Sequence, residues 1–383
     1  MSCSAGTRPT LPFGEDICLF YMTMKLKPVY LLWLLLPWLV ACSNDETPEV
    51  PGEEGETEEV WTENYHFKLP VVFHVLYANP NDAQQNPSKE HLDKILKGLN
   101  EVYANCGVDL NMEFVPATED PEGNVMEEPG IDRVQWTNKS IYYQAFMDGY
   151  EQRYLDVLWD QNKYINIVFY KFADAEGSTA ASRVQGISTF PTLVKPAQLS
   201  GFSSLDEAVS PGQLKKAVCV SINNDCINAL RDDYTTFDEE NYDAQDVVVT
   251  LAHEVGHYLG LYHAFSTDDS KNDTDYCSDT PIYNRTEYNE ILGQYTSWEE
   301  YSKHFSELVW RTDCDGNKYK SDNIMDYVVS YRNKFTAQQR DRIRYILDNA
   351  ILMPGPKKPQ TEEAKSLTSR TSGQVDIPVR FSE

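Results

Sequence analysis

Apolar positions along the chain follow two different periods, and these periods predict an alternation of strands and helices. Four segments are rich in β-branched and aromatic residues, as strands are. They are 69–77, 109–115, 164–170 and 216–222. Other segments place apolar residues at the spacing of one helix face. These expected helices are 91–103, 246–259 and a last helix that begins near Thr336, together with the aromatic-rich segment 140–160.

Local signals mark the ends of two of these helices. Thr336 can cap the last helix, and Gln339 three residues later completes a capping box. Gly260 follows the helix at 246–259 and can enter left-handed backbone conformations without a Cβ penalty. The chain is therefore expected to turn at Gly260.

Three histidines flank that turn in the sequence HEVGHYLGLYH, residues 253–263. His253 and His257 are four apart, so both imidazoles project from one face of a helix. The turn at Gly260 brings His263 to a third position around the same metal ion. Three protein ligands leave a fourth position open for water, as in catalytic zinc sites. The alternative is a helix with three ordinary histidines, and the full motif disfavours it.

Glu254 directly follows the first predicted ligand, so it is expected to lie beside the open position and not among the ligands. A carboxylate there can take a proton from zinc-bound water and later deliver it to the leaving amine. The alternative is a solvated glutamate on the helix surface.

This pattern resembles the metzincin clan of zinc peptidases, and residues 323–327 (NIMDY) resemble the Met-containing turn of that clan. The resemblance implies that Met325 forms a hydrophobic floor beneath the three histidines, and an ordinary core methionine is the alternative. It also implies that Tyr327 lies near the metal and stabilises the oxyanion of the tetrahedral intermediate. Ordinary packing is the alternative for Tyr327.

Within the clan, the chain is most similar to the pappalysin/ulilysin-like family. The features that carry the likeness are the motif at 253–263, the sequence CSDTP at 277–281, Cys314, the sequence FTAQQR at 335–340 and the strand-like segment 69–77. Ala264 directly follows the third histidine, where other metzincin groups usually carry a different residue, such as Asp or Glu, so the chain does not resemble those groups.

The resemblance implies an α+β metzincin zinc-peptidase fold, with a twisted mixed sheet, a zinc-binding helix and a smaller C-terminal subdomain. The catalytic domain would cover 65–352, with an upper part at about 65–260 and a lower part at 261–352, followed by a tail at 353–383. The Ser-, Thr- and Gly-rich segment 177–191 would hold the edge strand along which an extended substrate pairs by backbone hydrogen bonds.

The N-terminal segment carries targeting signals. Its apolar run, 29–41, is too short to span a bilayer and suits the core of a signal peptide. Residues before Met22 or Met24 show no feature of a targeting signal. We therefore expect a signal peptide over 1–41 whose true start is one of these methionines.

Residues 39–42 (LVAC) resemble a bacterial lipobox, which implies cleavage before Cys42 and lipidation of its side chain. A plain secretory signal or a short buried helix is the alternative. Residues 42–64 are acidic and contain Pro and Gly, which predicts a lipidated, disordered linker. The sequence SNDE after Cys42 resembles acidic export signals, so we expect a lipid anchor in the cell envelope, at the outer membrane and facing outward.

The formal net charge of −27 argues against nucleic acid and anionic lipid surfaces as partners. The expected partners are a protein or peptide substrate and, through the lipid at Cys42, a membrane. We expect the chain to be a monomer.

An exported chain favours disulfides. By resemblance, Cys277 and Cys314 match family positions that tend to pair, and Cys219 and Cys226 are close enough in sequence for a local bridge. Cys106 is expected to be a buried free thiol.

One more histidine and one acidic loop contain side chains of types that bind metals. His74, inside an apolar strand, is expected to be a core histidine. The resemblance also implies structural Ca²⁺ near an acidic loop, for which a solvated loop is the alternative. Its residues are Asp268, Asp269, Asn272, Asp273 and Asp275.

These observations favour a zinc-dependent endopeptidase with one catalytic Zn²⁺. Two other hypotheses remain: a surface binding protein that keeps a peptidase fold without turnover, and a zinc hydrolase that acts on a non-peptide amide. Intact His253, Glu254, His257, His263 and Tyr327 argue against the silent binding protein.

Overall fold

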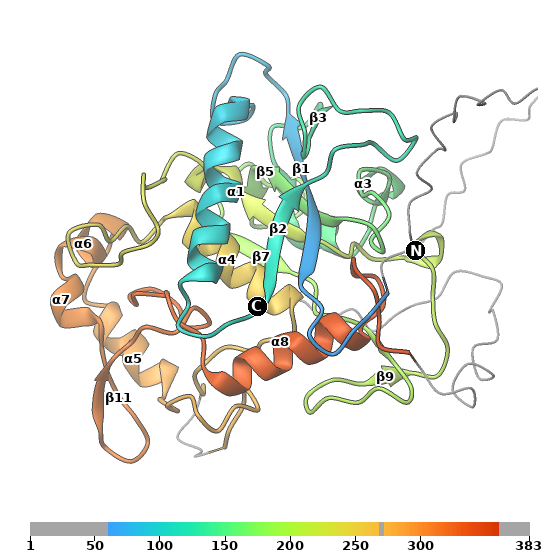
Figure 1. The fold of residues 1–383 in the computed structure, drawn as a ribbon. Coiled ribbons are helices and arrows are strands. Elements are labelled where there is room, and N and C mark those ends of the chain that lie inside the picture. The colour runs from blue at the N-terminus through green and yellow to red at the C-terminus, as the bar shows by residue number, and fades with distance from the viewer. Residues whose placement is uncertain (1–59, 268–271, 360–383) are drawn as a thin grey trace, which may run out of the picture. The chain divides into compact units, whose positions relative to one another are not determined.

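The structure is a computed structural model that describes residues 60–267 and 272–359 (Figure 1). The predicted signal peptide, the lipidation site Cys42 and most of the acidic linker lie outside the described residues, as do Asp268, Asp269 and the tail from residue 360.

A mixed sheet with the strand order β2-β1-β5-β10-β7 forms the centre of the fold, and β3 also pairs with β1. Its members are β1 (Phe67–Tyr77), β2 (Met112–Pro116), β3 (Ile131–Gln135), β5 (Ile165–Tyr170), β7 (Gly186–Ser188) and β10 (Val220–Asn223). β1 pairs in parallel with β2 along its first half and with β3 along its second half, while β5 pairs in parallel with its middle. β10 is parallel to β5, and β7 closes this edge as an antiparallel strand.

Side chains that alternate along each strand divide the core between the two faces of the sheet. On β5, Ile165, Ile167 and Phe169 belong to the larger hydrophobic core, whereas Val168 and Tyr170 belong to a smaller core. A strand buried on both faces reads as a continuous apolar run, which is why 164–170 was recognisable in the sequence.

Helices cover both faces. They are α1 (Lys89–Ala104) and α4 (Val247–Tyr258) on the larger core, and α2 (Tyr143–Met147) and α3 (Gln152–Asp156) on the smaller core. Figure 1 shows α1 and α3 on opposite sides of β1. The expected helices at 91–103 and 246–259 are thus confirmed as α1 and α4.

The expectation of one helix over 140–160 is wrong. The segment holds the short strand β4 (Ile141–Tyr142) and the two five-residue helices α2 and α3. Gly149 separates these helices with a φ of +64°, and a Cβ there would lie 2.2 Å from the carbonyl oxygen of Lys215. The chain therefore turns at Gly149, and both Phe146 and Tyr154 reach the smaller core.

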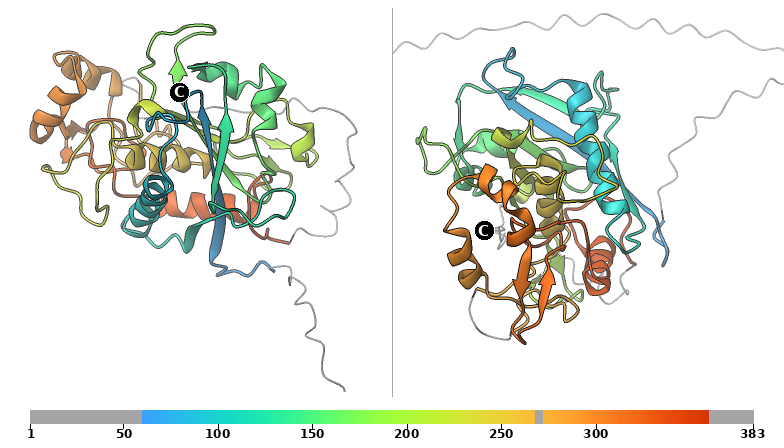
Figure 2. Two further views of the ribbon diagram at one scale, coloured as in Figure 1. Left: turned by 90° about the horizontal axis from the view of Figure 1, so that it is seen from above. Right: turned by 90° about the vertical axis from the view of Figure 1, so that its left-hand side faces the viewer.

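A third hydrophobic cluster lies C-terminal to α4 and runs from Phe265 to Val329. The elements of this region are α5 (Arg285–Leu292), α6 (Trp298–Lys303), α7 (Phe305–Leu308), β11 (Trp310–Thr312) and β12 (Lys318–Lys320). Figures 1 and 2 show the three helices and β11, in orange, gathered on one side of the molecule.

The last helix, α8 (Ala337–Asn349), returns to the larger core through Ile343, Ile346 and Leu347. Its predicted capping box is present, because Thr336 Oγ1 accepts the N–H of Gln339 at 3.2 Å and Gln339 Oε1 accepts the N–H of Thr336 at 3.0 Å.

The remaining elements are short. They are β6 (Phe172–Ala173), β8 (Leu193–Val194), β9 (Ser204–Leu205) and the 3₁₀ turns η1 (Pro211–Gln213) and η2 (Asn224–Cys226). Among the helices that the structure describes, none has the length and apolar character needed to cross a bilayer. The predicted α+β fold with a mixed sheet is confirmed.

The disulfides expected from the sequence are not found, since all five described cysteines are free thiols. Cys219 precedes β10 and Cys226 follows it, and the two side chains belong to the cores on opposite faces of the sheet. The Cys219 thiol contacts Met147 Sδ in the smaller core at 3.8 Å, whereas Cys226 belongs to the larger core and donates to Asn223 O at 3.0 Å.

The pair that the resemblance implied, Cys277 and Cys314, is also unbonded. Burial and the neighbouring Asp275 raise the pKa of the Cys277 thiol to about 12. The thiolate is the form that reacts in disulfide exchange, so this thiol is held in its inert form. Cys314 is half-buried in the β11–β12 connection, where its N–H donates to Ile282 O at 2.9 Å.

Candidate metal centre and active site

Helix α4 is buried over its whole length, and its first turn is anchored by Asp246. The Asp246 carboxylate accepts the N–H groups of Val248 and Val249 at 2.9 and 3.0 Å. The same carboxylate pairs with Arg231 at 2.6 Å. A cap held from outside the helix fixes its axial position, and with it the position of His253 two turns later.

The turn predicted after the helix is confirmed. Gly260 has a φ of +92°, and a Cβ there would lie 2.7 Å from Ile346 of α8. Glycine therefore serves both the left-handed conformation and the close approach of α8. Beyond the turn, the Nε2 atom of His257 lies 3.1 Å from that of His253 and 3.0 Å from that of His263.

Backbone carbonyls determine which ring nitrogen of two histidines carries the proton. His253 Nδ1 donates to Ile324 O at 2.8 Å, and His257 Nδ1 donates to Leu261 O at 2.7 Å. In a neutral ring the other nitrogen, Nε2, then holds a lone pair. Burial lowers the pKa of His253 to about 4 and the pKa values of His257 and His263 well below their ordinary range, so the rings are neutral near pH 7.

Neutral imidazole nitrogens that face one another at this distance repel unless a cation lies between them. Nitrogens bound to a tetrahedral zinc at about 2.0–2.1 Å would be about 3.3 Å apart, close to the spacing found here. Three imidazoles are also a donor set that suits zinc. Within residues 60–267 and 272–359, these histidines are the one group of three potential metal ligands that comes together. The residues present therefore fit the predicted metal.

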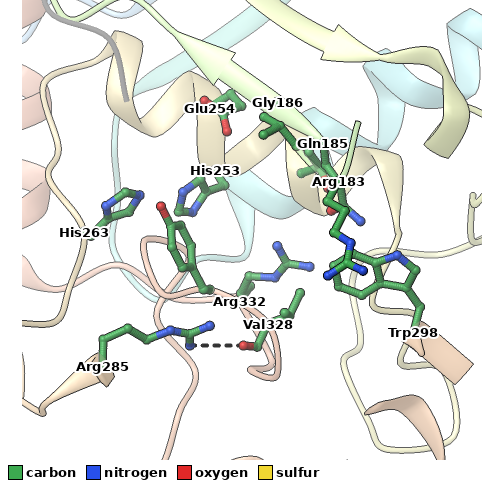
Figure 3. Close-up of a pocket in the computed structure, with 13 residues that line it drawn as sticks. Arg183, Gln185, Gly186, His253, Glu254, His263, Arg285, Trp298, Val328 and Arg332 are labelled. Atoms are coloured by element: carbon green, nitrogen blue, oxygen red, sulfur yellow. Dashed lines mark hydrogen bonds between the residues drawn. The ribbon is translucent and has the colours of Figure 1, made fainter. Parts of the chain in front are cut away.

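A cavity of about 270 Å³ opens beside the histidines. One wall comes from the segment that leads into β7, and another from α4. Further walls come from His263, from α5 and α6, and from the loop that follows Met325. Figure 3 shows these walls, with Gly186 and Glu254 facing Val328 and Arg332 across the space.

Glu254 lies in the wall of this cavity and is only 6 % exposed. It packs against Gly186 of β7, where a Cβ would lie 2.5 Å from Glu254 Cγ and 2.9 Å from Glu254 Oε1 (Figure 3). The edge strand expected within 177–191 is thus present as β7. β7 contacts the predicted catalytic carboxylate at Gly186, where any larger residue would clash with the Glu254 side chain.

Met325 lies against the helix that carries the first two histidines. A Cβ at Gly256 would come within 2.4 Å of the Met325 sulfur. The backbone around Met325 contacts the histidine segment twice, since Ala264 N–H donates to Met325 O at 3.0 Å and Ile324 O accepts the His253 Nδ1 proton. One turn therefore fixes both the first histidine and the segment of the third.

The ring of Tyr327 lies in the cavity wall, 4.4 Å from the ring of His263 and 5.7 Å from that of His253, between centroids. Phe265 packs on it at 4.9 Å, and the guanidinium of Arg285 lies 5.1 Å from its centroid. The structure thus brings Tyr327 together with the predicted ligands.

Several residues of the cavity wall have no counterpart in the sequence-based predictions. They are Arg183, Arg285, Trp298 and Arg332. No spacing rule connects segments this far apart in the chain. Two of them carried a usable signal, because Arg183 lies within the predicted substrate-pairing segment 177–191 and Arg332 lies in the loop directly after the Met-containing turn.

Cys106 and His74 have structural roles. Cys106 is a buried free thiol, as expected, and burial raises its pKa. His74 is fully buried and bonded through both nitrogens, to Asp132 at 2.8 Å and to Asn166 at 2.8 Å. Its assignment as a core histidine is confirmed.

The calcium site stays a prediction. In the described part of the acidic loop, Asp273 Oδ1 accepts the N–H groups of Asp275 and Cys277, each at 3.2 Å. Burial and the hydrogen bond to Asp273 raise the pKa of Asp275 to about 7.

A known family model matches part of the second half of the chain. Residues 228–348 match the family model of the M43 peptidases, described as pregnancy-associated plasma protein-A. Extracellular metalloproteases of Arthroderma benhamiae and Trichophyton verrucosum are each 53% identical over 96 residues, which is 24% of this chain and 29% of the relative. The chain thus spans less than a third of the length of the curated relatives that it matches.

Among solved structures, mature mirolysin of Tannerella forsythia in complex with a cleaved peptide is 24% identical over 73% of this chain and 91% of its own, with a TM-score of 0.47. A promirolysin mutant of the same organism is 22% identical over 75% of this chain and 82% of its own, with a TM-score of 0.48.

The class to which this site points is the metzincin-type zinc metallopeptidases, and that class implies a catalytic metal. Within the class, the resemblance to the pappalysin family that the motifs indicated is confirmed for residues 228–348, which include the histidines, the Met-containing turn and nearly all of α8.

Proposed function

We propose that this protein is a zinc-dependent endopeptidase that hydrolyses peptide bonds of extracellular proteins. The observation that carries the proposal is the convergence of three neutral imidazole nitrogens beside a cavity that also contains Glu254. The family match over residues 228–348 supports it.

In this proposal His253, His257 and His263 hold the zinc through their Nε2 atoms. Bound zinc supplies a Lewis acid that polarises a carbonyl and lowers the pKa of water. Glu254 accepts a proton from the attacking water and delivers it to the leaving amine. Tyr327 donates a hydrogen bond to the carbonyl oxygen as negative charge develops there.

The substrate would lie extended along β7. This strand is the antiparallel edge of the sheet, and an edge strand offers backbone N–H and C=O groups to a second chain. Gly186 leaves the carboxylate of Glu254 close to that strand, so a peptide paired with β7 would pass directly by the proposed base.

We also propose the two-part division of the catalytic domain near residue 260. The separate hydrophobic cluster between Phe265 and Val329 supports a lower part, and the cavity is lined by residues from both sides of the division. The packing of α8 into the larger core limits the lower part to the residues before that helix.

The proposed location is outside the cytoplasm, with a lipid anchor at Cys42. The names of the relatives, extracellular metalloproteases, support an extracellular location. The lipobox-like sequence before Cys42 supports the anchor.

The test compares three full-length proteins: wild type, Glu254→Ala and Glu122→Ala, the last a control at an exposed loop position. Zinc content and cleavage of casein and of a mixed peptide library are measured. About one zinc per chain in all three, with cleavage in all but Glu254→Ala, is the expected result. Full cleavage by Glu254→Ala, or no zinc in wild type, would overturn the proposal.

A further inference from the structure

The cavity beside the histidines is positively charged, although the chain has a formal net charge of −27. Arg183, Arg285 and Arg332 line it, and Glu254 is the one acidic residue among its lining residues. Cations that line a cavity of low dielectric attract anionic groups more strongly than they would at an open surface. The local charge therefore favours an anionic ligand.

Among the described arginines, Arg332 has two buried side-chain nitrogens without a hydrogen-bond partner, whereas Arg285 of the same cavity has one. Arg332 is 4 % exposed, and its Nε and Nη2 atoms are buried without a hydrogen-bond partner. The buried acids near it are already bonded, since Asp246 caps α4 and pairs with Arg231, and Asp326 pairs with Arg311. A buried charge without a partner is unfavourable, so an anion from outside the chain would stabilise this guanidinium.

Arg285 differs from Arg332 in degree, because its Nε atom is also buried without a hydrogen-bond partner but another of its nitrogens is bonded within the chain. Its Nη1 atom donates to Val328 O at 3.1 Å, the dashed line in Figure 3, and its guanidinium stacks against the ring of Tyr327. Arg285 therefore holds the loop that carries Val328 in place. Arg332 extends from the same loop with its guanidinium directed into the cavity (Figure 3).

The conformation of Arg332 supports a functional position. Its φ is +45°, in the left-handed region that residues other than glycine seldom occupy. Such conformations persist where the surrounding structure imposes them, commonly at ligand-binding sites. The two unpartnered atoms, Nε and Nη2, form one edge of the guanidinium fork, which matches the two oxygens of a carboxylate.

We propose that Arg332 binds a carboxylate of the substrate, and that the enzyme prefers an Asp or Glu side chain directly beside the scissile bond. Arg332, His253 and Glu254 line the same small cavity, so a carboxylate bound to Arg332 belongs to a residue adjacent to the bond that is cut. This inference rests on the proposed peptidase function and adds the class of substrate to it. A chain-terminal carboxylate has the same chemistry, and the experiment separates the two sources.

The experiment uses two peptide series and the full-length protein. In the first series the peptides are blocked at both ends, and the residue on each side of the scissile bond is Glu, Gln or Lys in turn. In the second series the only carboxylate is the free C-terminus of the residue next to the scissile bond. We measure kcat/KM for each peptide, and we measure binding of the uncut peptides to Glu254→Ala by calorimetry.

Three variants accompany the wild type. Arg332→Gln removes the charge, and Arg332→Lys keeps the charge but not the forked geometry. Lys334→Gln is the matched control, because it removes a cation of the same loop that is exposed and pairs with Asp322 at 3.1 Å, outside the cavity. Zinc content and melting temperature are recorded for each variant, so that misfolding is recognised.

We expect wild type and Lys334→Gln to cleave the Glu peptide of the first series roughly 10- to 100-fold better than the Gln peptide, the size of a charge-assisted hydrogen-bonded pair. Folded Arg332→Gln should reduce this ratio to about one, and Arg332→Lys should restore part of it. If Arg332→Gln does not fold, two other Glu-over-Gln ratios still test the preference. One is the ratio of kcat/KM values of wild type, and the other is the ratio of affinities for Glu254→Ala.

Equal kcat/KM values of wild type for the Glu and Gln peptides would overturn the inference. An unchanged Glu-over-Gln ratio in folded Arg332→Gln would do the same. In both cases cleavage of the peptides would still support the proposed peptidase function. A preference confined to the second series would assign the carboxylate to a chain terminus and overturn the side-chain preference. Cleavage of no peptide would count against the peptidase function, and the calorimetric ratio would then decide on Arg332 alone.

Discussion

The sulfur of Met325 occupies the space beside Gly256, within 2.4 Å of where a Cβ of that residue would lie. Gly256 is on the helix between His253 and His257, so the Met-containing turn approaches the metal centre only because this position has no side chain. The same turn accepts the Nδ1 proton of His253 through Ile324 O. Packing under the helix and orientation of the first ligand are therefore coupled.

Gly256→Ala tests this coupling. Helix propensity alone favours Ala over Gly by about 1 kcal/mol, whereas inserting a methyl group into a filled space costs about 1–3 kcal/mol. We expect a net loss in the free energy of unfolding and weaker zinc retention, measured by denaturation and by metal content after dialysis. Gly212→Ala, where nothing lies within 4 Å of the added Cβ, should change neither. A Gly256→Ala protein more stable than wild type, with full zinc, would contradict the close packing.

Gly186→Ala addresses the carboxylate of Glu254. The added Cβ would lie 2.5 Å from Glu254 Cγ, so the side chain must move away from β7. Because small displacements of a catalytic group reduce rates strongly, kcat/KM should fall about tenfold or more while zinc content stays near one per chain. Peptide cleavage and metal analysis on the same preparation check this. Unchanged kcat/KM would mean that the position of Glu254 against β7 has no bearing on catalysis.

Tyr327→Phe removes one hydroxyl and keeps the ring that packs on His263. If the hydroxyl stabilises charge on the carbonyl oxygen, kcat should fall roughly 100-fold with little change in KM. Tyr331→Phe is the control, since this tyrosine of the same loop bonds to Glu239 at 3.3 Å and does not line the cavity. Equal kcat values for both variants would assign Tyr327 to packing alone.

The metal-free protein should lose stability in acid. Burial lowers the pKa of His253 to about 4 and the pKa of His257 well below 6.5. Between these values and 6.5 the unfolded chain binds more protons than the folded chain, so the free energy of unfolding falls as the pH falls through this window. We expect part of this loss to disappear in His257→Gln, because one of the histidines that resist protonation is then absent. Denaturation of chelator-treated protein between pH 7 and 4.5 measures it.

His304, whose side chain is 44 % exposed, provides the control substitution at a histidine outside the metal centre. His304→Gln should keep the slope of wild type, and restoring zinc at pH 7 should raise the melting temperature of wild type and of His304→Gln by mass action. A stability that does not change over this pH range would mean that the buried histidines do not resist protonation.

Cys42→Ser tests the lipid anchor, which lies outside the described residues. With a lipobox before Cys42, wild type in a bacterial host should incorporate labelled palmitate and sediment with membranes. Cys42→Ser should do neither. Cys314→Ser, which removes a free thiol of the folded domain, should behave as wild type. Unlabelled wild type would show that the chain is not lipidated at this site.

The sequence by itself determined the parts of this protein that depend on residues close together in the chain. The four-residue spacing of His253 and His257, the turn at Gly260 and the capping box of Thr336 follow from helix geometry and from the conformational freedom of glycine. These contacts are local, so their distances are set by backbone dihedral angles alone.

Tertiary structure alone decided the contacts between distant segments. Gly186 meets Glu254, and Arg332 enters the cavity beside His253, because the sheet edge and the loop after Met325 face one another across the cavity beside α4. The same kind of contact broke the expected helix at Gly149, next to Lys215 O. It also placed Cys219 and Cys226 in different hydrophobic cores, where both are free thiols. Which side chains share a space depends on how the core is filled as a whole, and no spacing within the sequence specifies it.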